Sequence, residues 1–145
     1  MTHRPAAAAA IDGGARGNPG EAGCGILLEV GGRREEHTLY LGAATNNVAE
    51  YAALLAALER AQALGVDSLE VRSDSRLLVE QMNGGYKVRA AHLKPLWLRA
   101  RMLAAGFRRF TISHVSRADN RAADRLANRA MDERSSTLRR PEGLP

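Results

Sequence analysis

The sequence predicts an α/β protein in which helices cover the faces of a mixed β-sheet. Five short segments have the apolar character of strands, and four longer segments carry apolar residues at helical spacing. Strand and helix segments alternate in the second half of the chain, where crossover helices between parallel strands are therefore expected. At 145 residues, the chain fits one domain, and no apolar run approaches the ~20 residues needed to cross a bilayer.

The first three strands are expected over residues 6–11, 23–32 and 34–45. The segment AAAAAI is an apolar run of strand length, and GCGILLEVGG and REEHTLYLGAAT meet at glycines suited to a hairpin. Asp12 would end the first strand, and the turn formers GGARGNPG follow it. The order of these segments predicts three antiparallel neighbours.

Helical spacing begins at Asn47 and continues to Leu64, and Gly65 stands where a helix would stop. Residues 68–74, SLEVRSD, alternate as a strand does. The segment SRLLVEQMNGG that follows is a short helix closed by its two glycines.

The last elements are a helix over about 93–105, a strand over 107–116 and a helix over 121–134. Pro95 falls in the first turn of the earlier helix, where a missing amide donor costs little. The domain is therefore expected to span residues 1–134, and the polar segment 135–145 is expected to be disordered.

The charge of the chain favours nucleic acid as a partner. A net charge of +5 and a pI near 10.1 describe a basic protein, which attracts polyanions and releases their counterions on binding. The amino terminus lacks the long apolar core of a secretory signal, so a cytoplasmic protein without a membrane segment is expected.

Four acidic residues stand at the ends of predicted elements. Two of them, Asp12 and Asp74, end strands, and two, Glu50 and Asp124, lie in or near the first turn of helices. If these ends meet, they form a cluster of hard oxygen ligands suited to Mg²⁺ or Mn²⁺. A pair of such ions would relieve the repulsion among the carboxylates, activate water and hold the leaving oxygen of a phosphodiester.

Each acid also has a purely structural interpretation. Glu50 lies three residues after Asn47, which is the spacing of a capping box. Asn120 could cap the last helix, in which Asp124 would then only complement the helix dipole. The remaining two acids could be a helix N-cap and a turn former, Asp74 and Asp12 respectively. Spacing alone leaves both interpretations open.

Around these acids the chain closely resembles the type 1 ribonuclease H family, in particular its compact bacterial and archaeal branch. The matching segments occur in family order and span nearly the whole chain: DGGARGNPG (12–20), TNNVAEYAAL (45–54), SDSRLLVEQMNG (73–84) and HVSRADNRAADRLAN (114–128).

The resemblance implies a ribonuclease H-like fold, with strand order 3-2-1-4-5 and helices on both faces of the sheet. It also implies two-metal hydrolysis of the RNA strand of RNA·DNA hybrids, leaving 5′-phosphate and 3′-hydroxyl ends. Asp12 would bridge two Mg²⁺ or Mn²⁺ ions when substrate is bound. Glu50 and Asp74 would complete one ion's site, and Asp124 would join Asp12 around the ion that activates water.

The same resemblance implies a set of substrate contacts. The glycine-rich segment that begins at Gly13 would let the backbone approach the hybrid, since a Cβ would obstruct it. Amides and hydroxyls near the groove would contact sugars, base edges and a DNA-strand phosphate. Together the predicted substrate-binding residues are Gly13, Asn18, Thr45, Asn46, Asn47, Arg117 and Asn120.

Two segments depart from the family pattern. His114 stands at the same distance before Asp124 as a family histidine that assists proton transfer or product release. However, HVSRADN replaces the usual glycine-rich loop. His114 could therefore be structural, with Arg117 supplying a positive group near the phosphate. The segment NGGYKVRAAHLKPLW also lacks the long basic protrusion of some relatives and keeps only Lys87, Arg89 and Lys94. We therefore expect modest, steeply salt-dependent binding by a monomer.

Two other functions compete with hybrid cleavage. The same acids could cut double-stranded RNA or a branched nucleic acid, because one fold serves several nucleases. Alternatively, the domain could bind hybrid without cutting it, although a binding module would be expected to have lost at least one acid.

Overall fold

A computed structural model of the chain describes residues 5–145, so residues 1–4 of the predicted domain lie outside the described part. The elements follow the predicted order of three strands, helix, strand, two helices, strand and helix. Their bounds are β1 (Ala6–Arg16), β2 (Gly20–Val30), β3 (Arg33–Ala44), α1 (Asn46–Ala63), β4 (Ser68–Ser73), α2 (Arg76–Asn83), α3 (Lys94–Ala105), β5 (Arg109–His114), the 3₁₀ turn η1 (Arg117–Asn120) and α4 (Arg121–Glu133).

The sheet has the predicted strand order, β3-β2-β1-β4-β5. The first three strands are antiparallel neighbours, and β4 runs parallel to both β1 and β5. The prediction of a mixed five-stranded sheet is therefore confirmed. No helix within residues 5–145 is long and apolar enough to cross a bilayer.

The first strand is longer than predicted. β1 does not end at Asp12 but continues to Arg16, which pairs with Glu21 of β2. The backbone groups of 12–16 find their hydrogen-bond partners on β2, so the turn formers GGAR extend the ladder and only 17–19 remain as the turn. Asp12 consequently lies within the sheet instead of at the end of its strand.

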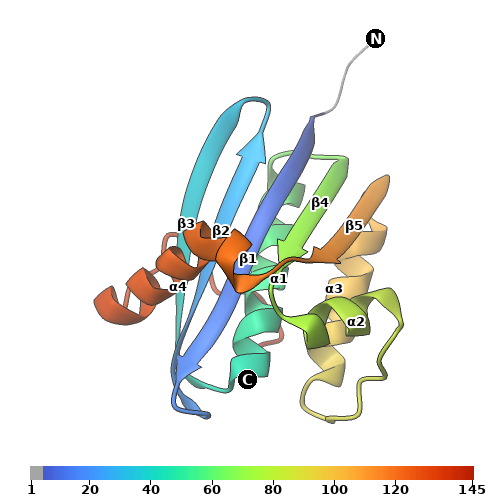
Figure 1. Cartoon of the computed structure of the whole chain (residues 1–145). Helices are drawn as coiled ribbons and strands as arrows, with labels where there is room; N and C mark the ends of the chain where they lie inside the picture. Colours follow the sequence, from blue (N-terminus) through green and yellow to red (C-terminus); the bar gives the residue numbers. More distant parts are fainter. Residues whose placement is uncertain (1–4) are drawn as a thin grey trace.

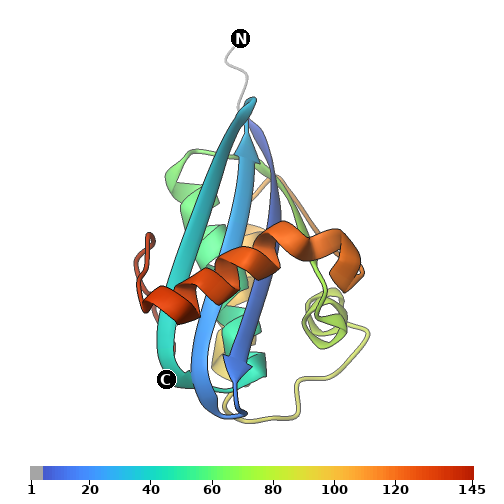
Figure 2. The same ribbon diagram turned by 60° about the vertical axis from the view of Figure 1, so that its left-hand side comes forward.

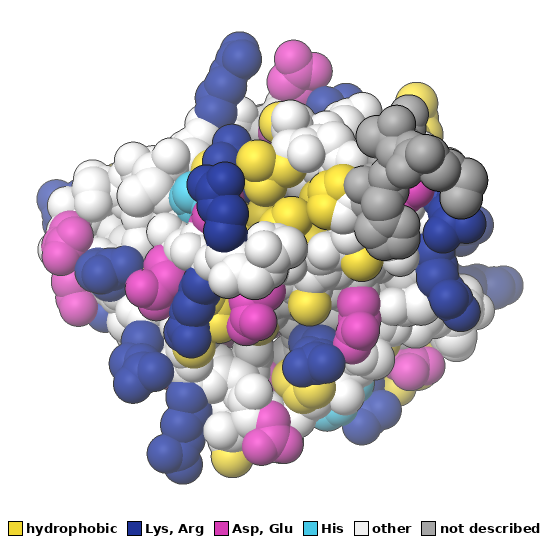
Figure 3. Space-filling view, turned by 90° about the horizontal axis from the view of Figure 1, so that it is seen from above, with side chains coloured by type: hydrophobic (Ala, Val, Ile, Leu, Met, Phe, Trp, Pro, Cys, Tyr) yellow, Lys and Arg dark blue, Asp and Glu magenta, His cyan; other side chains and the backbone are white. Residues whose placement is uncertain are grey.

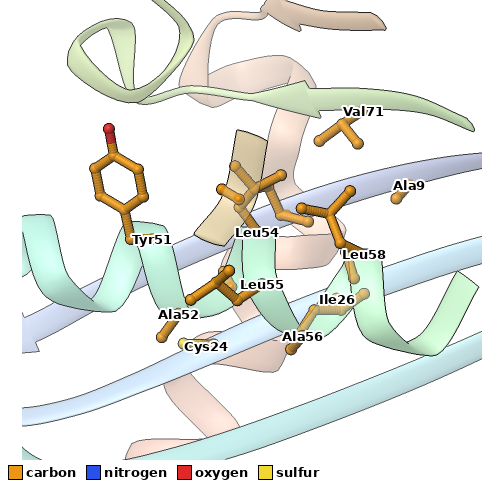
Figure 4. Close-up of a cluster of buried hydrophobic side chains, with 14 of the residues drawn as sticks. Ala9, Cys24, Ile26, Tyr51, Ala52, Leu54, Leu55, Ala56, Leu58 and Val71 are labelled. Atoms are coloured by element: carbon orange, nitrogen blue, oxygen red, sulfur yellow. The ribbon is translucent and has the colours of Figure 1, made fainter. Parts of the chain in front are cut away.

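Helices cover both faces of the sheet. Figures 1 and 2 show α4 crossing β1–β3 on one face, and α1 and α3 on the other. The core lies between α1 and the sheet, where Leu54, Leu55 and Leu58 are fully buried with Ile26 and Val71 (Figure 4). Burial of such side chains provides ~1.5–3 kcal/mol each, so this interface holds α1 rigidly on the strands.

Helix α4 approaches β2 closely because the strand carries glycines there. A Cβ at Gly25 would lie 2.6 Å from the backbone nitrogen of Ala127, and it would overlap the carbonyl oxygen of Ala123. Gly25 therefore allows the backbone of α4 to rest on the sheet. This contact brings the first turns of α4, including Asp124, toward β1.

The C-terminal segment is ordered, although the sequence predicted that it would be disordered. Residues 135–145 contain no helix or strand, but the Thr137 hydroxyl accepts a hydrogen bond from Thr38 N at 2.9 Å, and Ser136 accepts one from Tyr40 N at 2.8 Å. Arg140 donates to the carbonyl of Leu41. β3 is an edge strand whose outer backbone groups lack a neighbouring strand, and these bonds satisfy them.

Candidate active site

Strand pairing places Asp12 and Asp74 side by side. The parallel ladder between β1 and β4 ends with the pair Ile11 and Ser73, so the two aspartates are the next residue on each strand. Asp12 is buried, with 9% of its surface exposed. The predicted N-cap role of Asp74 is wrong, because the Ser75 hydroxyl accepts from Leu78 N and caps α2.

Glu50 comes to the same point from the first turns of α1. Its Oε1 accepts a hydrogen bond from Gly13 N at 2.9 Å. The capping-box interpretation of Glu50 and Asn47 is wrong, because Thr45 is the N-cap of α1 and accepts from Val48 N. The glutamate therefore points at β1 instead of back at the start of its own helix.

These three carboxylates form a cluster in which one oxygen from each lies within 4.8 Å of the others. The pKa of Asp12 is raised to about 8, mainly by burial and further by the neighbouring Asp74 and Asp124. Burial, together with the charges of Asp12 and Asp74, raises the pKa of Glu50 well above its ordinary value. The cluster therefore resists carrying three negative charges unless a cation shares the site.

Asp124 faces the same hollow from α4, although it is not one of the three clustered acids. Its proximity raises the pKa of Asp12, and it lines the hollow with the other three acids. Asn128, one turn further along α4, donates from Nδ2 to the Asp124 carbonyl at 3.0 Å and to Asp124 Oδ1 at 3.4 Å. The Asn128 Oδ1 in turn accepts from Arg16, which also pairs with Asp132 at 2.7 Å.

Asn128 and Arg16 were not among the predicted site residues. The spacing of Asn128, four residues after Asp124, was the available signal, because residues four apart share a helix face. No signal in the sequence links Arg16 to α4, since the two segments are more than a hundred residues apart.

Asn120 does not lie on the surface, where the predicted contact with substrate would require it. It is only 2% exposed, and its Nδ2 donates to Ile11 O at 2.9 Å and to Asp74 Oδ2 at 3.2 Å. It makes no side-chain cap on α4 either. Asn120 instead ties the end of β1 to the Asp74 carboxylate, and so it orients one acid of the cluster.

Arg117 lines the hollow beside the acids. Its charge lowers the pKa of Glu50, against the larger effect of burial. His114 ends β5, one strand further from β1 than Asp74, and it is exposed. It does not line the hollow that contains the four acids.

The predicted groove residues meet at the start of α1. Asn46 accepts from Ala15 N at 2.8 Å, and Asn18 accepts from Asn46 N at 3.0 Å. These bonds fix the turn after β1 against the start of α1, beside the hollow. Asn47 is exposed on the first turn of the helix, and Thr45 caps it.

The donor set suits a hard divalent cation. All four acids offer oxygen, and within residues 5–145 no histidine or cysteine joins the cluster of three. The raised pKa values of Asp12 and Glu50 have the same main cause, which is burial, and the charges of the neighbouring acids raise them further. The residues present therefore fit a metal ion of the Mg²⁺ or Mn²⁺ class.

Comparison with known proteins finds relatives that match most of the chain. Residues 10–130 match the family described as reverse transcriptase-like. The chain is 45% identical to RNase H1 from Halobacterium salinarum, whose crystal structure covers 88% of this chain and 98% of its own, with a TM-score of 0.83. LC11-RNase H1, solved in complex with an RNA/DNA hybrid, shares 41% identity over the same fractions, also with a TM-score of 0.83.

A bifunctional protein of Mycobacterium tuberculosis is 48% identical over 124 residues, which is 83% of this chain. The chain spans about a third of the length of that relative, since the match covers 34% of it.

Proposed function

The chain belongs to the type 1 ribonuclease H family, and on this premise we propose that it is a metal-dependent endonuclease that cuts the RNA strand of RNA·DNA hybrids. The observation that carries the proposal is the cluster of Asp12, Glu50 and Asp74 within 4.8 Å, with Asp124 on the same hollow. A relative that shares 41% of its sequence has been solved with an RNA/DNA hybrid, which supports the substrate class.

The four acids would hold two Mg²⁺ or Mn²⁺ ions when substrate is bound. Such ions supply an activated water and stabilise the leaving oxygen of the phosphodiester, which gives 5′-phosphate and 3′-hydroxyl products. The chain's own part is to hold the carboxylates in place before substrate arrives. Gly13 N positions Glu50, and Asn120 positions Asp74.

Substrate contacts surround this cluster. Arg117 presents a positive charge to the phosphate from the wall of the hollow. The side-chain amides of Asn18, Asn46 and Asn47 face the sugars and base edges, where the 2′-hydroxyl distinguishes RNA from DNA. Thr45 contacts a phosphate of the DNA strand, and His114 acts near the site only if β5 or the following turn moves toward it.

The test is cleavage of a labelled RNA·DNA hybrid, compared with duplex RNA and duplex DNA of the same sequence. We expect Mg²⁺- or Mn²⁺-dependent cleavage of the RNA strand of the hybrid, abolished by a chelator. Equal or faster cleavage of duplex RNA would favour the alternative substrate instead.

The Asp74→Asn variant separates an enzyme from a binding module. It should lose cleavage and keep nearly full affinity for hybrid, because the amide cannot replace a carboxylate ligand but leaves the surface unchanged. Substantial turnover by this variant would contradict the assigned metal site.

A further inference from the structure

Four arginines form a single row along η1 and α4. Arg121, Arg125 and Arg129 of α4 recur every four residues, which is the spacing of one ridge on a helix surface, and Arg117 stands four residues before them in η1; all four are exposed. We call this row the arginine ridge. Like charges four residues apart repel each other on a helix, so the row does not serve the stability of α4.

No member of the arginine ridge forms an ion pair with any carboxylate of residues 5–145. Acids do lie near it, but two of them have other partners: Asp132 pairs with Arg16, and Glu36 lies 4.0 Å from Arg34. Glu133, at the last turn of α4, lines the shallow hollow beside Arg125 and Arg129. Asp119 and Asp124 lie between members of the ridge along the chain, but neither forms an ion pair with them. The four guanidinium groups are therefore exposed without a carboxylate partner among residues 5–145.

The arginine ridge begins in the active site. Arg117 lines the hollow that holds the four acids, and Asn128 lines both that hollow and a second, shallow one that Arg125 and Arg129 border. The two hollows are thus neighbours across α4. Figures 1 and 2 show that the first turns of this helix lie beside the end of β4 and that the helix then crosses the sheet.

We propose that the arginine ridge is an additional substrate-binding surface, which holds the phosphates of the hybrid beyond the scissile bond. This inference rests on the proposed function. Four residues of helix rise about 6 Å, and one strand of a duplex advances about 3.4 Å per nucleotide along its axis. From Arg117 to Arg129 the ridge spans roughly 18 Å, enough for about five nucleotides of one strand.

The arginine ridge would supply the duplex binding for which some relatives use a long basic protrusion, which this chain lacks. The segment between α2 and α3 keeps only a few basic residues, so the grip on the duplex must come from another part of the surface. Guanidinium groups suit this task because they bind phosphate oxygens in pairs.

The experiment compares two double variants that remove the same charge. R125Q/R129Q removes the distal half of the ridge. R33Q/R109Q is the control, because Arg33 and Arg109 are exposed residues at the opposite end of the sheet. Arg109 pairs with Ser68, which pairs with Ala6, six residues before Asp12. Figure 3, seen from above, shows basic and acidic side chains mixed over the visible face of the molecule.

Affinity for a hybrid should be measured against salt in the Asp74→Asn background, so that cleavage does not intervene. R125Q/R129Q should bind more weakly, and its slope of log K against log salt should be smaller by about 1.4–1.8, because each phosphate contact contributes about 0.7–0.9. The control should keep the slope of its parent. With otherwise unmodified enzyme, R125Q/R129Q should raise KM and leave kcat unchanged.

The length of the hybrid provides a second measurement. The difference between R125Q/R129Q and its parent should disappear when the hybrid ends fewer than about three nucleotides from the scissile phosphate on one side. Parental affinity in R125Q/R129Q, or an equal loss of slope in both double variants, would overturn the proposal. Failure of the proposed function would look different, because the unmodified enzyme would then not cleave hybrid at all.

Discussion

The backbone N–H of Gly13 donates a hydrogen bond of 2.9 Å to the carboxylate of Glu50, across 37 residues of sequence. The bond joins β1 to α1 at the point where the acids cluster. The Gly13 N–H also lowers the pKa values of both Asp12 and Glu50, because it favours the ionised carboxylates against the larger cost of burial.

Gly13→Ala should destabilise the protein and displace the site. An alanine Cβ would lie 2.6 Å from Glu50 N and would overlap the carbonyl of Ala49, so β1 and α1 would have to separate. We expect a loss of roughly 2–3 kcal/mol in the free energy of unfolding, measured with denaturant. Gly14→Ala is the matched control, since its Cβ meets nothing within 4 Å. An equally stable Gly13→Ala protein would contradict the tight contact.

Asn120→Ala should lower kcat more than it raises KM. The substitution removes the donor that holds Asp74 and leaves the buried carbonyl of Ile11 without its side-chain partner. The expected cost in stability is about 1–3 kcal/mol. Asn83→Ala removes a comparable bond to Ile112 O, and it should cost stability without altering the metal dependence of cleavage. If Asn120→Ala and Asn83→Ala had equal effects on the kinetics, Asn120 would contribute only to stability.

Asn128→Ala should raise the metal concentration needed for half-maximal cleavage several-fold. Without Asn128, the side chain of Asp124 loses the donor on its own helix that orients it. The substitution lies near the surface and should change the free energy of unfolding by less than about 0.5 kcal/mol. Calorimetric titration of the variant with Mn²⁺ measures the same effect without turnover. Unchanged metal affinity would show that Asp124 is held by other contacts.

The metal-free protein should become less stable as the pH rises from about 4 to about 8. The folded pKa of Asp12, about 8, exceeds its ordinary value of 3.8, so the folded state binds a proton that the unfolded state releases in this range. The stabilising effect of this proton is complete below the unfolded pKa and is lost as the pH passes the folded one. At about 1.4 kcal/mol per pKa unit, we expect Asp12 to contribute at most about 6 kcal/mol to this change.

Denaturant unfolding in the presence of a chelator measures this pH dependence. Asp12→Asn should flatten it and should make the protein more stable than its parent near pH 8. Saturating Mg²⁺ should also flatten it in the parent, because the cation replaces the proton. A stability that rises with pH in this range would oppose the charge conflict inferred for the cluster.

Removal of residues 135–145 should destabilise the sheet by roughly 2 kcal/mol, because at least two hydrogen bonds to the edge of β3 would be lost. Thermal unfolding of the shortened chain measures this effect. Thr137→Val is a milder test, since it keeps the shape of the side chain and removes only the hydroxyl that serves Thr38. If the shortened chain kept its full stability, the prediction that this segment is disordered would hold after all.

Local patterns were sufficient to predict most of the elements. The spacing of Val48, Tyr51, Leu54 and Leu58 predicted α1, whose observed bounds differ by one residue at each end. The order of the strands came from the family resemblance, and the pairing of β1 with both β2 and β4 confirms it. The predicted end of the first strand and the predicted disorder of the C-terminal segment were wrong. Both segments are ordered by backbone hydrogen-bond partners on a neighbouring strand, which composition does not reveal.

The sequence by itself indicated which acids to expect at the site and which elements hold them, because residue type and helical or strand periodicity are local properties, and the family resemblance chose between the catalytic and the structural interpretations. The tertiary structure alone decided how each side chain is held. Glu50 could have capped its own helix, but it reaches Gly13, and Asn120 turns from the surface toward Asp74. These choices depend on burial and on donors more than thirty residues away, which only the packed sheet and helices bring within hydrogen-bonding distance.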